Sequence, residues 1–337
     1  MLELKNVTKT FNLTGNAEDK RIALDNISLQ IEPGEFVTII GGNGSGKSTT
    51  LNIISGLLQP DSGQVLLNGI DITKKKDYQR AGYFGHVFQD PMMGTSGNMS
   101  VLENLEIAYI RGHFHSPIRW GFKKDDKEYF IEELKRFDLG LETRLNQKVG
   151  VMSGGQRQAL TLLMATMRNH PSKRMMRHDY ILFSGKDENI AKQEFDNSAI
   201  RIQNELRINI DSIKCSGYDK AKKYEQIKLA KHEAKNQLLA QFDLTKQILL
   251  LDEHTAALDP KTAKKVLDLT DKIVKENKMT TLMITHNMKD AITYGDRLIM
   301  FHLGHIILDV RGNEKKKLTP EDLLRMFDEA DERAIME

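Results

Sequence analysis

The sequence predicts a mixed α/β fold with a central sheet of parallel strands. One observation is a strand-like apolar run at residues 36–40, which leads through a glycine-rich loop into residues with helical spacing. A second is the apolar run at residues 248–251, whose four residues suit a central parallel strand buried on both faces. This run ends in two acids, which would emerge at the carboxyl edge of the sheet, where open α/β folds bind ligands.

Short strands are also predicted before the glycine-rich loop. Leu2, Leu4 and Val7 mark the first of them, and apolar residues alternate with polar ones over residues 27–31. The Pro33-Gly34 pair then predicts a turn into the buried strand at 36–40. The first forty residues are therefore expected to be mostly β-structure.

The composition is that of an ordinary globular protein. The chain has 337 residues, of which 39% are hydrophobic and 28% charged, which excludes disordered and fibrous classes for the chain as a whole. With 49 Lys and Arg against 47 Asp and Glu, the net charge of +2 argues against a dedicated nucleic-acid binder. The single cysteine, Cys215, excludes an intramolecular disulfide and fits a reducing compartment.

No targeting or membrane segment is expected. The first residues alternate between apolar and polar types, whereas a signal peptide would begin with an apolar core. No run approaches the roughly 20 apolar residues that a membrane helix needs. We therefore expect a soluble cytosolic chain.

The loop after the strand at 36–40 has the P-loop pattern of Gly, four residues and Gly-Lys-Ser. Glycines let backbone N–H groups approach phosphate oxygens, and the helix that follows adds its positive amino-terminal end. Lys47 would place a charge near the β- and γ-phosphates, and Ser48 would offer its hydroxyl to Mg²⁺. A glycine-rich turn without function is the alternative. The predicted nucleotide-binding residues here are Gly41, Gly42, Asn43, Gly44, Ser45, Gly46, Lys47, Ser48 and Thr49.

The two acids after the second buried strand complete this chemistry. Asp252 would help to hold Mg²⁺, and Glu253 would polarise the water that attacks the γ-phosphate. A strand that ends in a solvated acidic turn is the alternative, and the P-loop elsewhere in the chain argues against it.

Three further segments place polar residues at element ends. Ser153, Gly154 and Gly155 precede an apolar-periodic stretch, and such a helix start is an anion-binding arrangement that should face a phosphate. Gln89 and His286 each follow a strand-like run. Taken alone, a histidine at a strand end is usually structural.

Together these motifs resemble, in their order, the ATP-binding subunit of an ATP-binding cassette (ABC) transporter. Residues 41–48 match the Walker A motif, residues 248–253 Walker B, Gln89 the Q-loop, residues 152–156 the signature (with Met152 for the usual Leu), residues 257–259 the D-loop, and His286 the switch histidine. The resemblance implies a P-loop NTPase (RecA-like) core with an antiparallel β subdomain and an α-helical signature subdomain. It also implies an ATPase that uses ATP and Mg²⁺.

The resemblance assigns roles to individual residues. It implies catalytic roles for Glu253, His286 and Gln89, and a metal site formed by Ser48, Gln89 and Asp252. Phe11 is the candidate for stacking on adenine, with a core role as the alternative. The resemblance also implies a head-to-tail homodimer in which the signature of one copy contacts the nucleotide held by Lys47 of the other. The additional nucleotide-binding residues would be Ser153, Gly154, Gly155, Gln156 and Asp259.

A narrower resemblance is to bacterial importer ATPases that work with a simple permease and an extracytoplasmic binding lipoprotein. It implies uptake of a small solute such as an amino acid, with the ATPase at the cytoplasmic face of the membrane. The permease would dock on residues 92–99 and on the helix at 101–109.

One segment departs from the family pattern. Residues 171–245 look inserted into a single cassette domain that spans 1–337, because the signature normally runs almost directly into Walker B. Apolar residues with helical spacing run from Phe195 to Ile213 and again from Tyr224 to Phe242, with Ser216-Gly217 between them, which predicts an antiparallel helical hairpin. It could be a tolerated surface insertion, a docking or regulatory arm, or an arm for nucleic acid.

Other function classes fit less well. ABC proteins of DNA repair or chromosome organisation carry their long coiled coil between Walker A and the signature, whereas this insert follows the signature. Translation-type ABC proteins carry two cassettes, and only one P-loop is present here. An ABC exporter ATPase remains an alternative.

Overall fold

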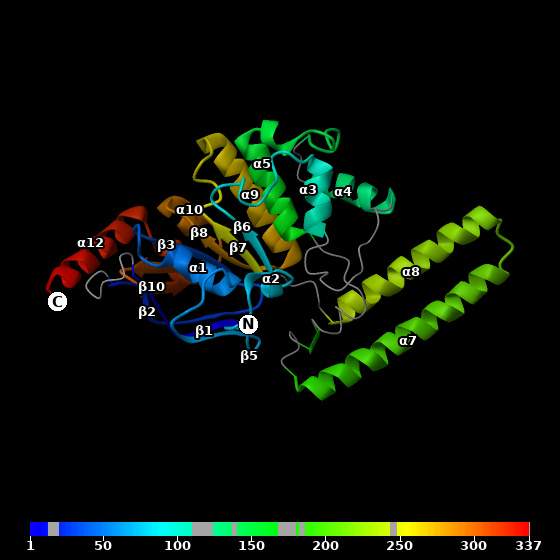
Figure 1. Cartoon of the computed structure of the whole chain (residues 1–337), viewed down its shortest axis with the longest axis horizontal. Helices are drawn as coiled ribbons and strands as arrows, with labels where there is room; N and C mark the ends of the chain where they lie inside the picture. The colour runs from blue at the N-terminus through cyan, green and yellow to red at the C-terminus, as the bar shows by residue number, and fades with distance from the viewer. Residues whose placement is uncertain are drawn as a thin grey trace. The chain divides into compact units, whose positions relative to one another are not determined.

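The computed structural model describes residues 1–12, 20–109, 124–136, 140–167, 180–181, 186–242 and 248–336 (Figure 1). The chain forms two compact units. The first consists of Met1–Leu66, Asp71–Asn169 and Lys246–Glu337, and the second of Leu67–Ile70 and His170–Thr245.

A six-stranded sheet forms the centre of the first unit, with the strand order β10-β9-β3-β8-β7-β6. Five of these strands pair in parallel, and only β10 runs antiparallel, at one edge. The residues of β3, β7 and β8 are almost entirely buried, which explains the continuous apolar runs of the sequence. The strands are β3 (Phe36–Gly41), β6 (Phe84–Val87), β7 (Ile248–Asp252), β8 (Thr280–Ile284), β9 (Arg297–His302) and β10 (His305–Arg311).

A second sheet of four strands has the order β2-β1-β4-β5. Its strands β1 and β2 pair antiparallel, and Phe11 of β1 lies opposite Arg21 of β2. The predicted β-rich start of the chain and the antiparallel subdomain are thus confirmed. The strands are β1 (Leu2–Asn12), β2 (Lys20–Ile31), β4 (Ser62–Leu67) and β5 (Ile70–Asp71).

Helices surround the large sheet and form the predicted helical subdomain. Leu105 of α3, Phe130 of α4 and Leu160 of α5 belong to one buried cluster with Leu249 of β7 and Leu267 of α9. The predicted parallel α/β core with a helical signature region is therefore confirmed. The helices are α1 (Lys47–Ser55), α2 (Asp77–Arg80), α3 (Val101–Tyr109), α4 (Lys124–Arg136), η2 (Val149–Val151), α5 (Gly154–Thr166), α9 (Pro260–Asn277), α10 (Met288–Thr293), α11 (Gly312–Lys317) and α12 (Pro320–Met336).

The second unit contains the predicted hairpin, in the helices α7 (Glu188–Cys215) and α8 (Lys220–Phe242) (Figure 1). Phe195 and Ile202 of α7 are buried in one cluster with Leu238 of α8, as the helical spacing predicted. The basic opening of the insert, residues 172–178, lies outside the described residues.

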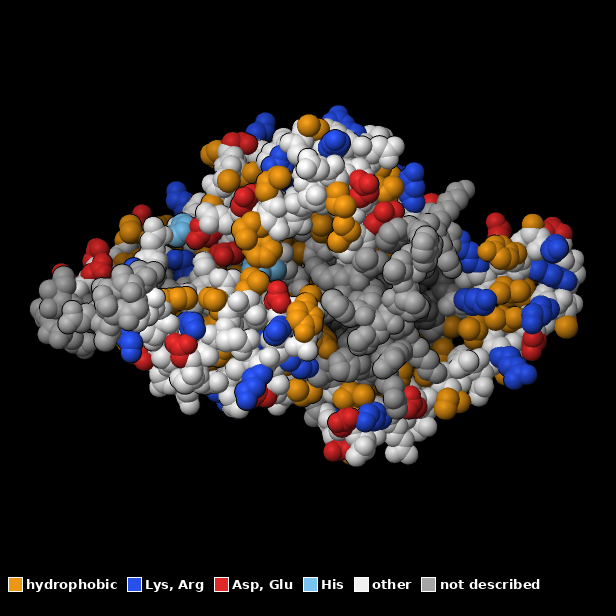
Figure 2. Space-filling model, in the orientation of Figure 1, with side chains coloured by type: hydrophobic (Ala, Val, Ile, Leu, Met, Phe, Trp, Pro, Cys, Tyr) orange, Lys and Arg blue, Asp and Glu red, His pale blue; other side chains and the backbone are white. Residues whose placement is uncertain are grey.

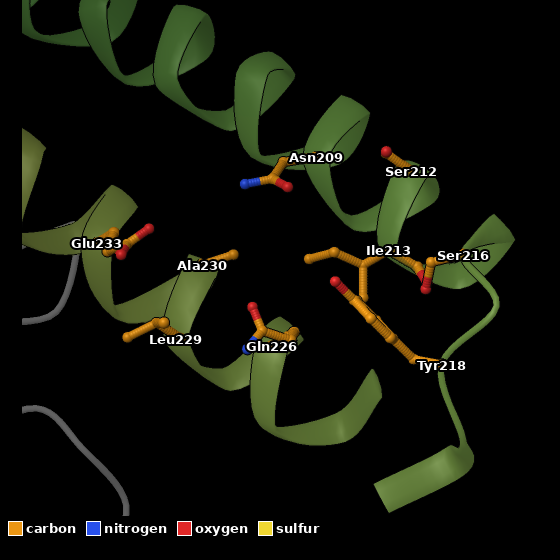
Figure 3. Close-up of a pocket in the computed structure, with 9 residues that line it drawn as sticks. All are labelled: Asn209, Ser212, Ile213, Ser216, Tyr218, Gln226, Leu229, Ala230 and Glu233. Atoms are coloured by element: carbon orange, nitrogen blue, oxygen red, sulfur yellow. The ribbon is translucent and has the colours of Figure 1, made fainter. Parts of the chain in front are cut away.

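The apolar face of the hairpin is incomplete near its turn. Tyr224, which the spacing placed on that face, is 73% exposed, so this part of the prediction is wrong. The helices leave a cavity of about 330 Å³ here, and polar residues such as Asn209 and Gln226 line it beside Ile213 (Figure 3). Tight apolar packing is therefore confined to the part of the hairpin farther from the turn.

Candidate functional site

The P-loop connects β3 to α1 and depends on its glycines. Gly46 caps α1 with φ 103° and Gly44 has φ 76°, two conformations that side chains disfavour. A Cβ on Gly46 would lie 2.4 Å from the carbonyl oxygen of Ala23, and one on Gly41 would lie 2.5 Å from that of Phe301. The glycines thus let the loop fit closely between β2 and β9.

Lys47, the first residue of α1, holds its ammonium group inside the loop. Its Nζ donates hydrogen bonds of 2.8 Å to the carbonyl oxygens of Gly41 and Gly42. Burial lowers the pKa of Lys47, while the nearby carboxylates of Glu253 and Asp252 act in the opposite direction. A cation is therefore positioned where the sequence predicted it.

Ser48 and Asp252, two of the three residues of the predicted metal site, lie next to each other. The Ser48 hydroxyl donates a 3.2 Å hydrogen bond to Oδ1 of Asp252. Burial raises the pKa of Asp252, and the neighbouring Glu253 raises it further. Hydroxyl and carboxylate oxygens are ligands that Mg²⁺ accepts, so this pair fits a magnesium ion.

Glu253 and His286 lie side by side because β7 and β8 are adjacent parallel strands that end at the same edge. Nε2 of His286 lies 2.5 Å from Oε1 of Glu253. The backbone N–H of Glu253 donates to the Ile284 carbonyl, and Glu253 has the left-handed φ of 45°. This conformation, uncommon in a residue with a side chain, aims the carboxylate along the sheet edge towards the histidine.

Gln89 is exposed and lies two residues after the end of β6, which is the neighbour of β7. Within the described residues its side chain makes no hydrogen bond, so the structure does not join it to Ser48 and Asp252. The preceding carbonyl, that of Phe88, accepts a weak 3.5 Å contact from Gln158 of α5. Gln89 therefore lies between the sheet edge and the helical subdomain, and its place in a metal site stays a prediction.

The signature residues cap α5 and contact the D-loop region of the same chain. Ser153 and Gln156 form a capping box at the start of α5. A Cβ on Gly155 would lie 2.3 Å from the methyl carbon of Thr262, whose backbone N–H donates to the carboxylate of Asp259. Gly154 likewise packs against Leu258. These contacts position the signature against α9, and no described contact joins it to the P-loop of its own chain.

Phe11 lies near the end of β1 and is partly buried, so it is not a core residue in this chain. Nζ of Lys9 lies 5.8 Å from the centre of its ring. Arg21, which lies opposite Phe11 and close to Gly44, belongs to none of the sequence motifs. The signal that could have revealed Arg21 is the pairing of β1 with β2, the two strands on either side of residues 13–19.

Comparisons with known proteins agree with this architecture. Residues 24–172 match the ABC transporter family model. The tyrosine transport ATP-binding protein of Clostridioides difficile is 37% identical over 334 residues, which cover 98% of this chain and 100% of that protein. A lipoprotein-releasing system ATP-binding protein of Wigglesworthia glossinidia brevipalpis is 35% identical over 173 residues, which cover 50% and 69% of the two chains.

A solved structure is similar as well. It is a dimeric, post-hydrolysis ATP-binding cassette bound to ADP and Pi, from Methanocaldococcus jannaschii, with 26% identity and a TM-score of 0.58. The match covers 92% of this chain and 98% of that one.

The fold and the site thus define a P-loop ATPase. The chain belongs to the ABC transporter family of ATP-binding proteins. The predicted family, fold and ATPase activity are confirmed by these comparisons. In the described parts of the chain, no helix is long and apolar enough to cross a membrane.

Proposed function

We propose that this chain hydrolyses ATP at the cytoplasmic face of the membrane to power import of an amino acid through a separate permease. The observation that carries the proposal is the meeting of Lys47, Asp252, Glu253 and His286 at the carboxyl edge of one sheet. The name of the C. difficile relative supports tyrosine, or a similar amino acid, as the first solute to test.

The geometry supports a division of roles at this edge. Glu253 polarises the attacking water, and His286 fixes the carboxylate through the 2.5 Å contact and reaches the γ-phosphate. Ser48 and Asp252, with Gln89, would hold Mg²⁺, which would supply positive charge to neutralise the phosphates. Lys47 binds the β- and γ-phosphates once they replace its present carbonyl partners.

The proposal includes a head-to-tail homodimer. Ser153 and Gly154 are exposed at the positive end of α5, where a phosphate is well accommodated. Since their described contacts do not include their own P-loop, a second copy supplies the nucleotide that they contact. The dimeric state of the M. jannaschii cassette supports this arrangement.

An exposed apolar surface supports permease docking. Met93 and Val151 are 70% and 71% exposed, and Met92 and Ile107 are also exposed. On the face drawn in Figure 2, hydrophobic side chains lie in several small groups among polar and charged ones. Backbone hydrogen bonding between Gly97 and Gly150 brings the 92–99 segment and the Val151 region together. Methionines provide an adaptable apolar surface, which suits a permease helix. An extracytoplasmic binding lipoprotein would complete the importer.

The test is transport by the assembled complex. The chain is purified from membranes with the permease that accompanies it and reconstituted into vesicles that enclose ATP in the lumen, and radiolabelled tyrosine or other amino acids are added outside. We expect ATP-dependent uptake of one amino acid, and no uptake with the Glu253→Gln variant in an otherwise identical complex. Release of solute from the lumen would identify an exporter, and a co-purifying partner without membrane spans would contradict the transporter assignment.

A further inference from the structure

We propose that Arg21 binds the phosphate chain of the nucleotide, as a second cation beside Lys47. The guanidinium group of Arg21 lies against the P-loop itself. A Cβ built on Gly44 would lie 2.6 Å from Nη2 of Arg21, 3.4 Å from Cζ and 3.9 Å from Nη1. Because Gly44 has no side chain, the guanidinium group of Arg21 can lie against the loop at this position. The proposal rests on ATP binding at this loop.

The path of β2 explains why Arg21 reaches the loop. Ala23 and Leu24 pack against Gly46, where a Cβ would lie 2.4 Å from the Ala23 carbonyl oxygen and 2.6 Å from Cδ2 of Leu24. This contact fixes β2 along the loop between β3 and α1. Arg21 is two residues before Ala23 in the same strand, so its side chain is within reach of the loop.

The pairing with β1 places Arg21 next to the candidate adenine platform. Phe11 lies directly opposite Arg21 in the antiparallel ladder, and opposite residues project from the same face of a sheet. Arg21 thus reaches from the strand position beside the Phe11 ring to Gly44. A nucleotide with its base on Phe11 and its phosphates in the P-loop would pass along this side chain.

The side chain of Arg21 is exposed beside the loop. Among the described residues Arg21 makes no hydrogen bond or ion pair, and its side chain is exposed. Lys47, by contrast, lies in the field of Asp252 and Glu253 and is hydrogen-bonded to two carbonyls. A guanidinium presents two parallel N–H donors that match phosphate oxygens, and such charge-assisted bonds are stronger than neutral ones.

A purely structural role is the alternative, in which the guanidinium only covers the loop. The two roles differ in what they do to different ligands. A phosphate contact affects ADP and pyrophosphate equally, whereas a structural role lowers the melting temperature without ligand. Base stacking by Phe11 affects ADP and leaves pyrophosphate unchanged. The two ligands therefore separate the three roles, and neither of them is hydrolysed during the measurement.

The experiment measures ADP and pyrophosphate affinities by calorimetry, with Mg²⁺, together with melting of the ligand-free protein. Arg21→Met should weaken both ligands by about tenfold, as expected for the loss of one charge-assisted hydrogen bond, and Arg21→Lys should recover part of the loss. The matched control is Lys20→Met, which removes the same charge from the adjacent residue on the opposite face of β2. We expect the control to change both affinities less than about twofold, as for a screened surface charge. Phe11→Ala should weaken ADP alone.

Equal affinities in Arg21→Met and Lys20→Met would overturn the proposal. A fall in the ligand-free melting temperature that accounts for the whole affinity loss, in Arg21→Met and Arg21→Lys alike, would favour the structural role. Failure of the wild-type protein to bind ADP would contradict the nucleotide site itself, and that result is distinct from a failure of Arg21.

Discussion

Glu253 combines an uncommon backbone conformation with a close histidine partner. We predict that Glu253→Gln keeps nucleotide binding but lowers ATP turnover by about 10²–10⁴-fold, the usual contribution of a general base. Its amide is nearly isosteric with the carboxylate and keeps an oxygen near His286, so the fold should not change. Steady-state phosphate release and calorimetric ATP affinity measure the two effects. Turnover within threefold of the wild type would contradict the role of Glu253.

His286 is predicted to act through the same contact. His286→Ala should remove most hydrolysis while ATP affinity changes little, because the side chain is about half exposed and contributes little to the core. A large fall in the melting temperature would instead show that this histidine is structural. The same two assays, with melting added, separate these outcomes.

Burial of His86, in β6, should make the folded chain sensitive to acid. It is stacked against Phe88 at 4.1 Å between ring centres, and burial lowers its pKa to about 4. The unfolded chain, whose histidines titrate near 6.5, therefore binds a proton that the folded chain does not bind between about pH 6.5 and 4. Stability is then lost as pH falls through this window, and it is fully present above it.

The variant that tests this is His86→Phe, which keeps an aromatic contact with Phe88 and cannot be charged. At pH 5 the wild type should have lost about 2 kcal/mol of unfolding free energy from this group relative to pH 8, on a shift from 6.5 to about 4. Urea unfolding at both pH values should show a smaller loss in the variant. His305→Phe, at an exposed position, is the control. Equal acid losses in all three proteins would contradict the prediction.

The residues of local motifs could be predicted, because the residue types and their spacing in the sequence indicate nucleotide and metal binding. Lys47, Ser48 and Asp252 meet as predicted because a P-loop and a strand-end acid converge whenever β3 and β7 belong to one parallel sheet. Arg21 could not be found this way, since its position depends on the register of β2 against β1. The exposure of Tyr224 was missed because helical spacing does not report where two helices diverge.

At the scale of elements, α1 depends on a buried arginine from another helix. Nη1 of Arg80 donates 2.7 Å hydrogen bonds to the carbonyl oxygens of Ile53 and Ile54, in the last turn of α1. The remaining N–H groups donate to the carbonyls of Thr73 and Lys75, and burial lowers the pKa of Arg80 to about 10. A cation at the carboxyl end of the P-loop helix donates to carbonyls that would otherwise be unpaired. It also interacts favourably with the negative end of the helix dipole.

Arg80→Met should therefore cost about 3 kcal/mol or more of unfolding free energy, because several buried carbonyls lose their donor. Arg80→Lys should cost less, since an ammonium group can still reach some of them. Urea unfolding measures the difference, with Arg325→Met as control, because Arg325 is exposed and forms only surface ion pairs. Equal losses in Arg80→Met and the control would contradict the role of Arg80 as the cap of α1.

The elements of the cassette were easier to predict than the contacts between them. The runs at 36–40 and 248–251 became β3 and β7 because both are continuously apolar and flanked by polar residues. The packing of Gly155 on Thr262, which couples the signature to α9, could not be predicted. This contact depends on how two segments that are distant in the sequence approach each other. The sequence also offers another reason for a glycine at position 155, which is phosphate binding by the signature motif.

At the scale of the whole molecule, the proposed composite site requires two copies. Mixing a Lys47→Ala chain with a Ser153→Arg chain should restore activity, because each heterodimer contains one site with both elements intact. Each variant alone should be inactive. Ser153→Ala is the control for the lost cap of α5, which costs about 1 kcal/mol without adding bulk. Confirmed heterodimers without recovered ATPase activity would contradict the shared site.

The helical hairpin raises a separate question about the whole molecule, which is whether the cassette needs it. The apolar residues of its buried cluster all belong to the inserted segment, including Phe195, Ala199 and Leu238. The cluster that joins α3, α4 and α5 to the large sheet contains no residue of the hairpin helices. Each unit thus has its own core, which is typical of parts that fold independently.

We therefore predict that replacing residues 173–242 by a short Gly/Ser linker leaves a folded cassette that binds ATP. Loop closure depends only weakly on length, so a few flexible residues should allow β7 to take its place between β6 and β8. Thermal melting with ATP titration measures folding and binding, and uptake in cells measures transport. If the hairpin is a docking arm, the deletion abolishes uptake and spares ATPase activity, and if it is a tolerated insertion both remain. A broad, early melting transition without ATP stabilisation would show that the cassette core depends on the hairpin.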